Sequence, residues 1–321
     1  MSAATARGDY TPGEHNNWGR WGEDDRRGTA NLIEPAAVVA AAGLVSTGRV
    51  FCLAHAIGRP DAPHSVVRDA PRHYFTATGT DSVAGHPAAP ATAPGFDFND
   101  DAIDMPLQGS TQWDGLAHVQ TQDTLYNGFW AGTVTATGSK AVSIDHLRAS
   151  FVGRGVLLDV ARHLGVDGLV PGFRIEPALL DEVEAAQGVR VGAGDLLLIR
   201  TGHMRNWADL RTAGDREAFE HTPVPGLTGN CVPWLHERDV AALASDTRCV
   251  EVIPSGDPDG RPAPLHVGCL VDLGLTLGEL WALDELAADC AADGRYAFLL
   301  VAPPLNIAEA VGSPLNPIAI K

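Results

Sequence analysis

The chain has 321 residues, of which 45% are hydrophobic and 20% charged, a composition typical of a folded globular protein. Its 23 Lys and Arg residues against 40 Asp and Glu residues give a formal net charge of −17, which disfavours binding to nucleic acid or to anionic lipid surfaces. No segment approaches the roughly 20 apolar residues of a membrane span, and the first residues lack the apolar core of a signal peptide. We therefore expect a cytoplasmic protein that acts on a small molecule.

Strands and helices are expected to alternate along the chain, which favours a mixed α/β architecture. The first 30 residues are polar but carry Trp18 and Trp21, which predicts an arm that packs by its indoles before a catalytic domain over residues 31–321. Helix patterns, with Pro near the start or Gly at the end in several cases, cover 31–43, 176–187, 233–244 and most of 278–292. Short apolar runs predict buried strands at 155–161, 195–201, 249–253 and 296–302.

Residues 58–104 are rich in Pro, Gly, Ala and Asp, and residues 85–95 within them have the composition of a surface loop. A loop of this length in a compact enzyme is typical of a lid or a subunit contact. The five cysteines are scattered and have no Cys-x-x-Cys spacing, which indicates buried free thiols rather than a zinc knuckle.

One short segment, residues 109–118 (GSTQWDGLAH), concentrates polar chemistry. Gln112 and Asp114 are two positions apart, so they share one side of an extended strand. If the chain turns helical after Asp114, His118 returns to the face of Asp114, because positions four apart are helical neighbours. A carboxylate and an imidazole that meet in an apolar segment favour a divalent-metal site or a proton-transfer pair. The alternative from spacing alone is a helix N-cap at Asp114 and a solvated His118.

This segment resembles the signature of the putative cyclase family, which includes bacterial kynurenine formamidase and isatin hydrolase. The family signature is His-x-Gly-Thr-His-x-Asp-x-Pro-x-His, and the aligned stretch is QGSTQWDGLAH, residues 108–118. The threonine, the aspartate and the last histidine are kept, whereas Gln108 and Gln112 replace the first two histidines and Leu116 replaces the proline. Matches elsewhere extend the resemblance over nearly the full length, at 17–33, Pro225-Gly226, Trp234-Leu235, His266, Glu279, 302–306 and 312–316.

The resemblance implies an α/β fold of the kynurenine formamidase type, a swivelling β/β/α single domain with exchanged arms. Such proteins usually assemble, so a homodimer or homotetramer is expected, with the Trp-bearing arm and the Pro-rich loop as candidate subunit contacts. The resemblance also implies a metal site built from the signature and from a distant His and Glu. In this chain the retained ligand candidates are Asp114, His118, His266 and Glu279, and the substituted positions are Gln108 and Gln112.

The two carboxamides set the expected metal content. A carboxamide binds divalent metals far more weakly than an imidazole does, so one divalent ion is expected where the dinuclear members hold two. Oxygen from Gln112, Asp114 and Glu279 shifts the preference toward manganese relative to a histidine-rich zinc site, which leaves manganese and zinc as the two candidates. The alternatives are a hydrogen-bonded buried histidine at His118 or His266, and a favourable charge at a helix start for Glu279.

Other residues are candidates for catalysis or for the substrate pocket. Gln112 is expected to bind the metal, or to hydrogen-bond water or substrate, and joins Asp114 and His118 as a catalytic candidate. His203 follows an expected strand end, where α/β folds often place clefts, and is a candidate proton shuttle. Glu251, on an expected strand, is either a residue of the site or an ordinary structural residue of that strand. The pocket candidates, each with an ordinary core or surface role as its alternative, are Gln108, His73, Trp113, Phe129, Trp130 and Trp207.

Three functions follow from these patterns. The first is a metal-dependent hydrolase of an amide, lactam or ester bond in a small carbonyl compound, in which the metal polarises the carbonyl and activates water. The second is a cyclase or dehydratase of secondary metabolism that stabilises an enolate. The third is a metal-free small-molecule binding protein that retains only the fold.

Overall fold

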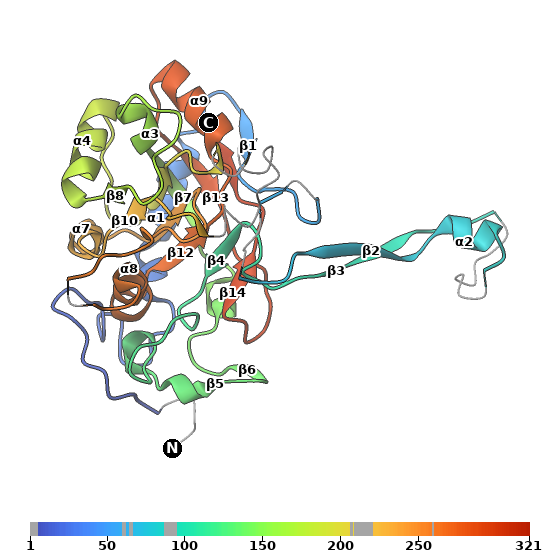
Figure 1. Cartoon of the computed structure of the whole chain (residues 1–321), viewed down its shortest axis with the longest axis horizontal. Coiled ribbons are helices and arrows are strands. Elements are labelled where there is room, and N and C mark those ends of the chain that lie inside the picture. Colours follow the sequence, from blue (N-terminus) through green and yellow to red (C-terminus); the bar gives the residue numbers. More distant parts are fainter. Residues whose placement is uncertain are drawn as a thin grey trace.

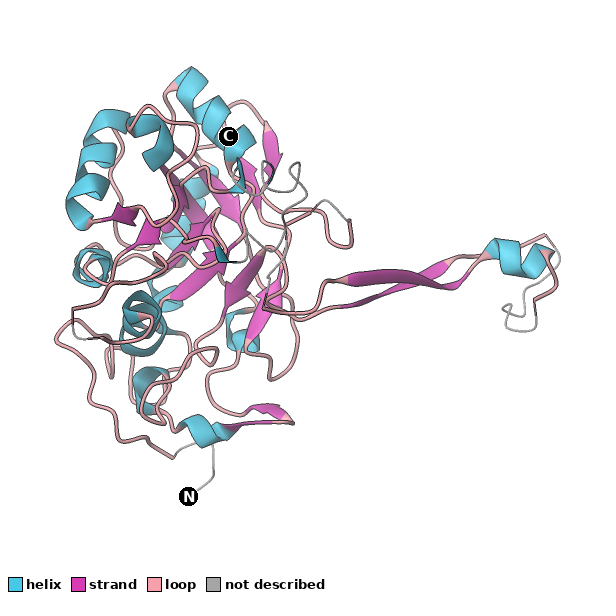
Figure 2. Cartoon of the chain, viewed as in Figure 1, coloured by secondary structure: helices cyan, strands magenta, loops and turns pink. Residues whose placement is uncertain are grey.

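The structure, a computed structural model, describes residues 6–59, 62–63, 67–86, 95–205, 208, 221–258 and 260–321. A nine-stranded mixed sheet forms its centre, in the order β1-β15-β13-β7-β9-β11-β12-β4-β14 (Figures 1 and 2). Four neighbouring strands in the middle of this sheet are parallel: β7 (Val152–Asp159), β9 (Leu196–Arg200), β11 (Ala242–Ser245) and β12 (Thr276–Glu279).

Antiparallel strands complete both sides of the sheet. One side carries β13 (Ala297–Val301), β15 (Ile318–Ile320) and β1 (Val50–Cys52). The other side carries β4 (Gln112–Asp114) and β14 (Gly312–Pro314). Two-stranded pairs lie outside the main sheet: β2 (Arg72–Ala77) with β3 (Asp100–Asp104), β5 (Val134–Thr135) with β6 (Gly138–Ser139), and β8 (Arg174–Ile175) with β10 (Gly226–Leu227).

Both faces of the sheet are buried, because alternate residues of its central strands enter two different apolar clusters. Along β9, Leu197 and Ile199 pack into one cluster, whereas Leu196 and Leu198 pack into the other. The α-helices are α1 (Pro35–Ala42), α2 (Gly79–Val83), α3 (Val160–His163), α4 (Pro177–Gln187), α7 (Cys231–Glu237), α8 (Pro264–His266) and α9 (Asp284–Asp293). Single 3₁₀ turns lie at Gly28–Leu32, Tyr126–Gly128, Ala131–Thr133 and Ile144–Leu147, and a π-helical stretch at Val267–Leu273.

The β2–β3 hairpin projects far from the body and carries α2 near its tip (Figure 1). Tyr74, Phe75 and Ile103 on its strands are at least half exposed. Of the surface loop expected at 85–95, residues 87–94 lie outside the described part of the chain. Among the described helices, none has the length and apolar character needed to cross a membrane.

The N-terminal segment packs against the body as the tryptophans predict. Trp18 Nε1 donates a 2.7 Å hydrogen bond to the Val271 carbonyl, and Asn17 Nδ2 donates one of 3.0 Å to the Leu273 carbonyl. Thr29 Oγ1 donates to the Ala241 carbonyl at 2.8 Å, next to the start of β11. Residues 17–29 of this segment are therefore anchored to the body by side chains.

Three sequence-based assignments are wrong. The helix expected at 233–244 ends with α7, and Ala242–Ser245 instead form β11, because this run of small and apolar residues fits between two other strands. The strand expected at 249–253 makes only isolated bridges, since Val250 has a φ of 45°. The helix expected from 278 begins only at Asp284, so Glu279 ends a strand.

The segment expected as a long loop at 58–104 contains the β2–β3 hairpin and α2, whereas the other helix and strand assignments agree with the structure within a few residues. The expected helix at 176–187 is α4, and Gly188 ends it in the left-handed conformation with a φ of 62°, a common role for glycine. All five cysteines are free thiols, but Cys52 is exposed, contrary to expectation, because its strand lies at the edge of the sheet.

Candidate metal and catalytic site

Strand β4 separates a core face from a polar face. Trp113 is fully buried, stacks its ring edge against Trp281 at a centroid distance of 4.8 Å, and donates from Nε1 to the Ala302 carbonyl. Gln112 and Asp114, which alternate with it, point to the other side, as the period of a strand requires. Trp113, expected in the pocket, thus lies in the core behind the polar pair.

Pairing with β12 adds a second carboxylate to this polar face. In the antiparallel register Gln112 is opposite Glu279. Gln112 Nε2 donates a 2.8 Å hydrogen bond to Glu279 Oε2 and a 3.3 Å hydrogen bond to Asp114 Oδ1. The amide nitrogen therefore lies between two buried carboxylates and offsets part of their repulsion.

His118 reaches Asp114 through a tight turn after β4. The His118 amide donates to the Gly115 carbonyl, and His118 Nε2 lies 3.6 Å from Asp114 Oδ1. Burial, with smaller contributions from the positive charges of Arg68 and His266, lowers the pKa of His118 to about 4. The imidazole is therefore neutral near pH 7, the state that binds a metal or accepts a proton.

A second imidazole–carboxylate pair faces the first. His266, at the end of α8, places Nε2 3.6 Å from Glu279 Oε1, and its Nδ1 lies 2.7 Å from Glu251 Oε2. Glu251 also accepts hydrogen bonds from the backbone amides of Leu265 and His266, at 3.0 and 3.1 Å. Burial disfavours the charged ring, but hydrogen bonds to Glu251 and Glu279 outweigh it and raise the pKa of His266 to about 10.

Cys249 is the residue of this cluster that the sequence patterns did not single out as a site residue. Its Sγ, a nitrogen of His266 and an oxygen of Glu279 lie within 4.8 Å of one another. Sequence patterns could not identify Cys249 as a site residue, because a strand expected at 249–253 does not predict that Cys249 and Glu251 turn toward His266. The turn centred on Val250 brings both residues there.

The cluster suits a cation on two grounds. Asp114 is buried, and both desolvation and the Glu279 carboxylate raise its pKa well above the usual range, as expected where negative charge is concentrated. The second ground is Gln112 Oε1, which is buried and accepts no hydrogen bond from the described residues. A buried acceptor oxygen beside an excess of carboxylates is a natural ligand for a divalent ion.

Two other candidates are buried near this region. Gln108 packs on Gly312, which is paired with Asp114, and the Gln108 carbonyl accepts a 3.2 Å hydrogen bond from Arg68 Nη1. His203 follows β9 and is fully buried, and burial, followed by the Arg248 charge, lowers its pKa to about 4.

The remaining pocket candidates lie elsewhere. Phe129 is buried beneath the guanidinium of Arg7, at 4.3 Å from the ring centroid, and Trp130 is 42% exposed beside it in the chain. His73 lies on the projecting hairpin and pairs with Asp101 at 2.5 Å. Trp207 is outside the described residues.

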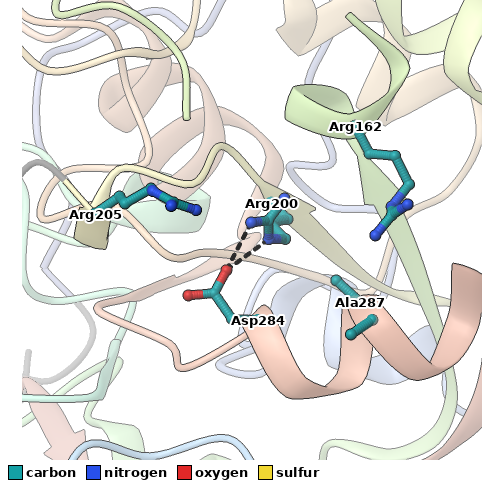
Figure 3. Close-up of a pocket in the computed structure, with 6 residues that line it drawn as sticks. Arg162, Arg200, Arg205, Asp284 and Ala287 are labelled. Atoms are coloured by element: carbon teal, nitrogen blue, oxygen red, sulfur yellow. Dashed lines mark hydrogen bonds and ion pairs between the residues drawn. The ribbon is translucent and has the colours of Figure 1, made fainter. Parts of the chain in front are cut away.

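A separate surface cavity of about 280 Å³ lies beside the start of α9 (Figure 3). Its lining includes three arginines, but each faces a carboxylate. Arg200 pairs with Asp284 at 2.7 Å and also with Asp159, Arg162 lies 3.5 Å from Asp159, and Arg205 lies 3.4 Å from Asp167. These charges are largely balanced within the protein, so the polar cluster around Gln112 is the stronger candidate site.

Comparison with known proteins agrees with this geometry. Isatin hydrolase from Roseibium aggregatum is 28% identical over 171 residues, which are 51% of this chain and 57% of that protein, so the match spans little more than half of its length. A crystal structure described as a novel cyclase is 44% identical, covers 96% of this chain and 100% of its own, and superposes with a TM-score of 0.89. Isatin hydrolase A from Labrenzia aggregata, bound to benzyl benzoate, is 22% identical with a TM-score of 0.57, over 87% of this chain and 94% of its own, and shares the fold.

The expected α/β fold class is therefore confirmed. A family model described as Putative cyclase matches residues 53–252, a range that contains Gln112, Asp114, His118 and Glu251. Because this match covers more than half of the sequence, the chain belongs to the putative cyclase family.

Proposed function

We propose that the protein is a metal-dependent hydrolase that cleaves an amide, lactam or ester bond of a small carbonyl compound. The observation that carries this proposal is the meeting of two imidazole–carboxylate pairs, Asp114 with His118 and Glu279 with His266, in one buried cluster. Similarity to isatin hydrolase supports hydrolysis as the reaction class.

One divalent ion, manganese or zinc, is proposed for this cluster. His266, Glu279 and Asp114 are the residues that would hold it, with Gln112 Oε1 as a neutral oxygen beside them. When bound, such an ion supplies Lewis acidity, which polarises a substrate carbonyl and lowers the pKa of water. Glu251 orients His266 by accepting a hydrogen bond from Nδ1, which directs Nε2 toward the cluster.

His118 is placed to move the proton. Its side chain is 23% exposed, whereas that of Asp114 is 1% exposed, so His118 lies on the solvent side of the pair. A neutral His118 Nε2 can take a proton from attacking water and return it to the leaving group, and Asp114 Oδ1 at 3.6 Å stabilises the resulting imidazolium. Arg68, which donates a hydrogen bond to the Gln108 carbonyl, adds positive charge that acts on both residues.

The experiment is hydrolysis of a panel of cyclic and acyclic amides and esters by protein whose metal content has been measured. We expect water-added products whose formation stops on chelation and resumes on metal addition, and a loss of about 100-fold or more in kcat/KM for Asp114→Asn. Full activity of Asp114→Asn, or of the metal-free protein, would contradict the proposal. Asp123→Asn, in a neighbouring loop, is the control variant.

A cyclase or dehydratase is the second candidate, favoured by one specific observation. The Gln112 amide occupies the space between Asp114 and Glu279, where a donor can stabilise an enolate oxygen as well as a carboxylate. Product mass separates the two functions, because hydrolysis adds water, dehydrative cyclisation removes it, and isomerisation leaves the mass unchanged. Products without added water would support this second candidate.

A further inference from the structure

Cys249 brings a sulfur atom to the His266–Glu279 side of the cluster. The three ligand atoms of Cys249, His266 and Glu279 lie within 4.8 Å of one another. Nδ1 of His266 is engaged by Glu251, so Nε2 is the nitrogen that faces Glu279, at 3.6 Å from Oε1. A tetrahedral zinc ion, with bonds of about 2.0 to 2.3 Å, separates its ligand atoms by roughly 3.5 Å. The His266–Glu279 pair is therefore already at the spacing that one ion requires, and the Cys249 sulfur lies within 4.8 Å of both ligand atoms.

The backbone holds Cys249 in this position by an unusual turn. The Glu251 amide donates to the Cys249 carbonyl around Val250, which has a φ of 45°. A β-branched residue rarely adopts the left-handed region, so the turn is maintained by its surroundings. Val250 is fully buried, which locks the turn and fixes the directions of its two neighbours. Glu251 orients the His266 imidazole, and Cys249 brings its sulfur to the same point.

We propose that Cys249 is a thiolate ligand of the catalytic ion, and that the site therefore selects zinc, or another thiophilic divalent ion, over manganese. Catalytic zinc sites have three protein ligands and an open fourth position, and thiolate sulfur, imidazole nitrogen and carboxylate oxygen are all zinc ligands. Thiolate favours zinc, whereas carboxylate, carbonyl and water ligands suit manganese. As the ion binds, the S–H bond of Cys249 and the Nε2–H bond of His266 break and both protons leave to the buffer, so no oxidant or reductant is needed. The inference rests on the proposed metal-dependent function.

This assignment divides the cluster into two parts with different tasks. Cys249, His266 and Glu279 hold the ion, so Cys249 takes the ligand position that the proposed function assigned to Asp114. Asp114 remains hydrogen-bonded to the Gln112 amide and close to His118. The Asp114–His118 pair is then available for the proton, whereas the thiolate places the ion on the Cys249 side.

Cobalt absorption spectroscopy tests the sulfur ligand directly. The full-length protein is stripped with a chelator, loaded with Co²⁺, and compared with Cys249→Ser and with Cys52→Ser, which removes an exposed free thiol. We expect a near-ultraviolet sulfur-to-cobalt charge-transfer band in the unmodified protein and in Cys52→Ser, and its loss in Cys249→Ser. In competition, Cys249→Ser should reduce the zinc-over-manganese preference by at least about tenfold.

The outcomes separate this inference from the proposed function. Bound Co²⁺ with visible d–d bands but no charge-transfer band overturns the thiolate ligand and leaves a metal-dependent hydrolase intact. Absence of bound Co²⁺, Zn²⁺ and Mn²⁺ in the unmodified protein overturns both. If Cys249→Ser fails to fold, as judged by circular dichroism, Cys249→Ala replaces it. A charge-transfer band that persists in a folded Cys249 variant also overturns the assignment.

Discussion

The amide nitrogen of Gln112 lies 2.8 Å from Glu279 Oε2, across an antiparallel strand pair in which the two residues are direct partners. The family signature has a histidine at this position, where an imidazole would direct a lone pair at a metal. Here an N–H group points at the carboxylate instead, so the Glu279 oxygen that accepts it faces a donor in place of an ion. The neutral amide of Gln112 therefore stabilises the Glu279 carboxylate at the place where a second cation could do so.

An imidazole at position 112 should create a second metal site. For Gln112→His we expect the metal content to rise from about one to about two ions per chain, because the new nitrogen would join Asp114 and His118. Elemental analysis after dialysis against zinc gives the stoichiometry. Gln120→His adds an imidazole at an exposed position of the loop that follows β4 and should leave the count at one. Equal metal content in both variants would show that the amide does not limit occupancy.

Glu251 is expected to act on the metal through His266. Glu251→Gln keeps the size of the side chain but removes the charge that holds the His266 Nδ1 proton, so the ring loses its fixed tautomer. We expect metal affinity to fall by about 10- to 100-fold while the bound ion keeps its ligands.

Competition with a chromophoric chelator measures this affinity. Glu237→Gln, at an exposed position of α7, is the matched control and should bind metal as the unmodified protein does. Unchanged affinity in Glu251→Gln would mean that the backbone hydrogen bonds to Glu251, and not its charge, position the imidazole.

The local part of the site could be predicted from the sequence. Gln112 and Asp114 share one face because side chains alternate in a strand, and His118 returns to Asp114 because the chain turns immediately after β4. The buried strands β7, β9 and β13 follow from short apolar runs, and α4 follows from its proline and glycine boundaries.

The rest depends on tertiary contacts that local patterns do not encode. Glu279 was expected near a helix start, but pairing of β12 with β4 extends it and places it opposite Gln112. Cys249 joins the site only because Val250 adopts a left-handed conformation that its residue type disfavours. The pairing of His266 with Glu279 could be predicted only from the resemblance to the family, because no local periodicity relates the two residues.

His203 should contribute an acid-sensitive term to stability. Its pKa is lowered by burial from 6.5 to about 4, so between these values the unfolded chain binds a proton that the folded protein does not. This contribution is complete above pH 6.5 and is lost as the pH falls toward 4, amounting to about 3 kcal/mol. The neighbouring Asp246, whose pKa burial raises to about 6, acts in the opposite direction, losing stability as the pH rises through the same window.

Urea unfolding at several pH values, compared between variants, isolates the histidine term. His203→Gln should lose the acid-sensitive part of the unfolding free energy, so its difference from the unmodified protein should shrink as the pH falls from 7 to 4.5. Val39→Ala, at an exposed position of α1 without a titratable group, should keep the original pH dependence. Parallel pH curves for His203→Gln and the unmodified protein would show that His203 does not titrate in this window.

The projecting hairpin should be a contact between copies of this chain. A two-stranded hairpin is marginally stable alone in water, and this one exposes 59% of Phe75, 51% of Tyr74 and 50% of Ile103. We expect a homodimer or homotetramer. Phe75→Asp should raise its dissociation constant by at least about tenfold, since an aromatic side chain that the subunit contact would bury is replaced by a charge. Light scattering across a dilution series measures the mass. Val39→Asp alters a more exposed residue, on α1, and should leave the assembly unchanged. A monomeric unmodified protein, or equal masses for all three proteins, would contradict a role for the hairpin in assembly.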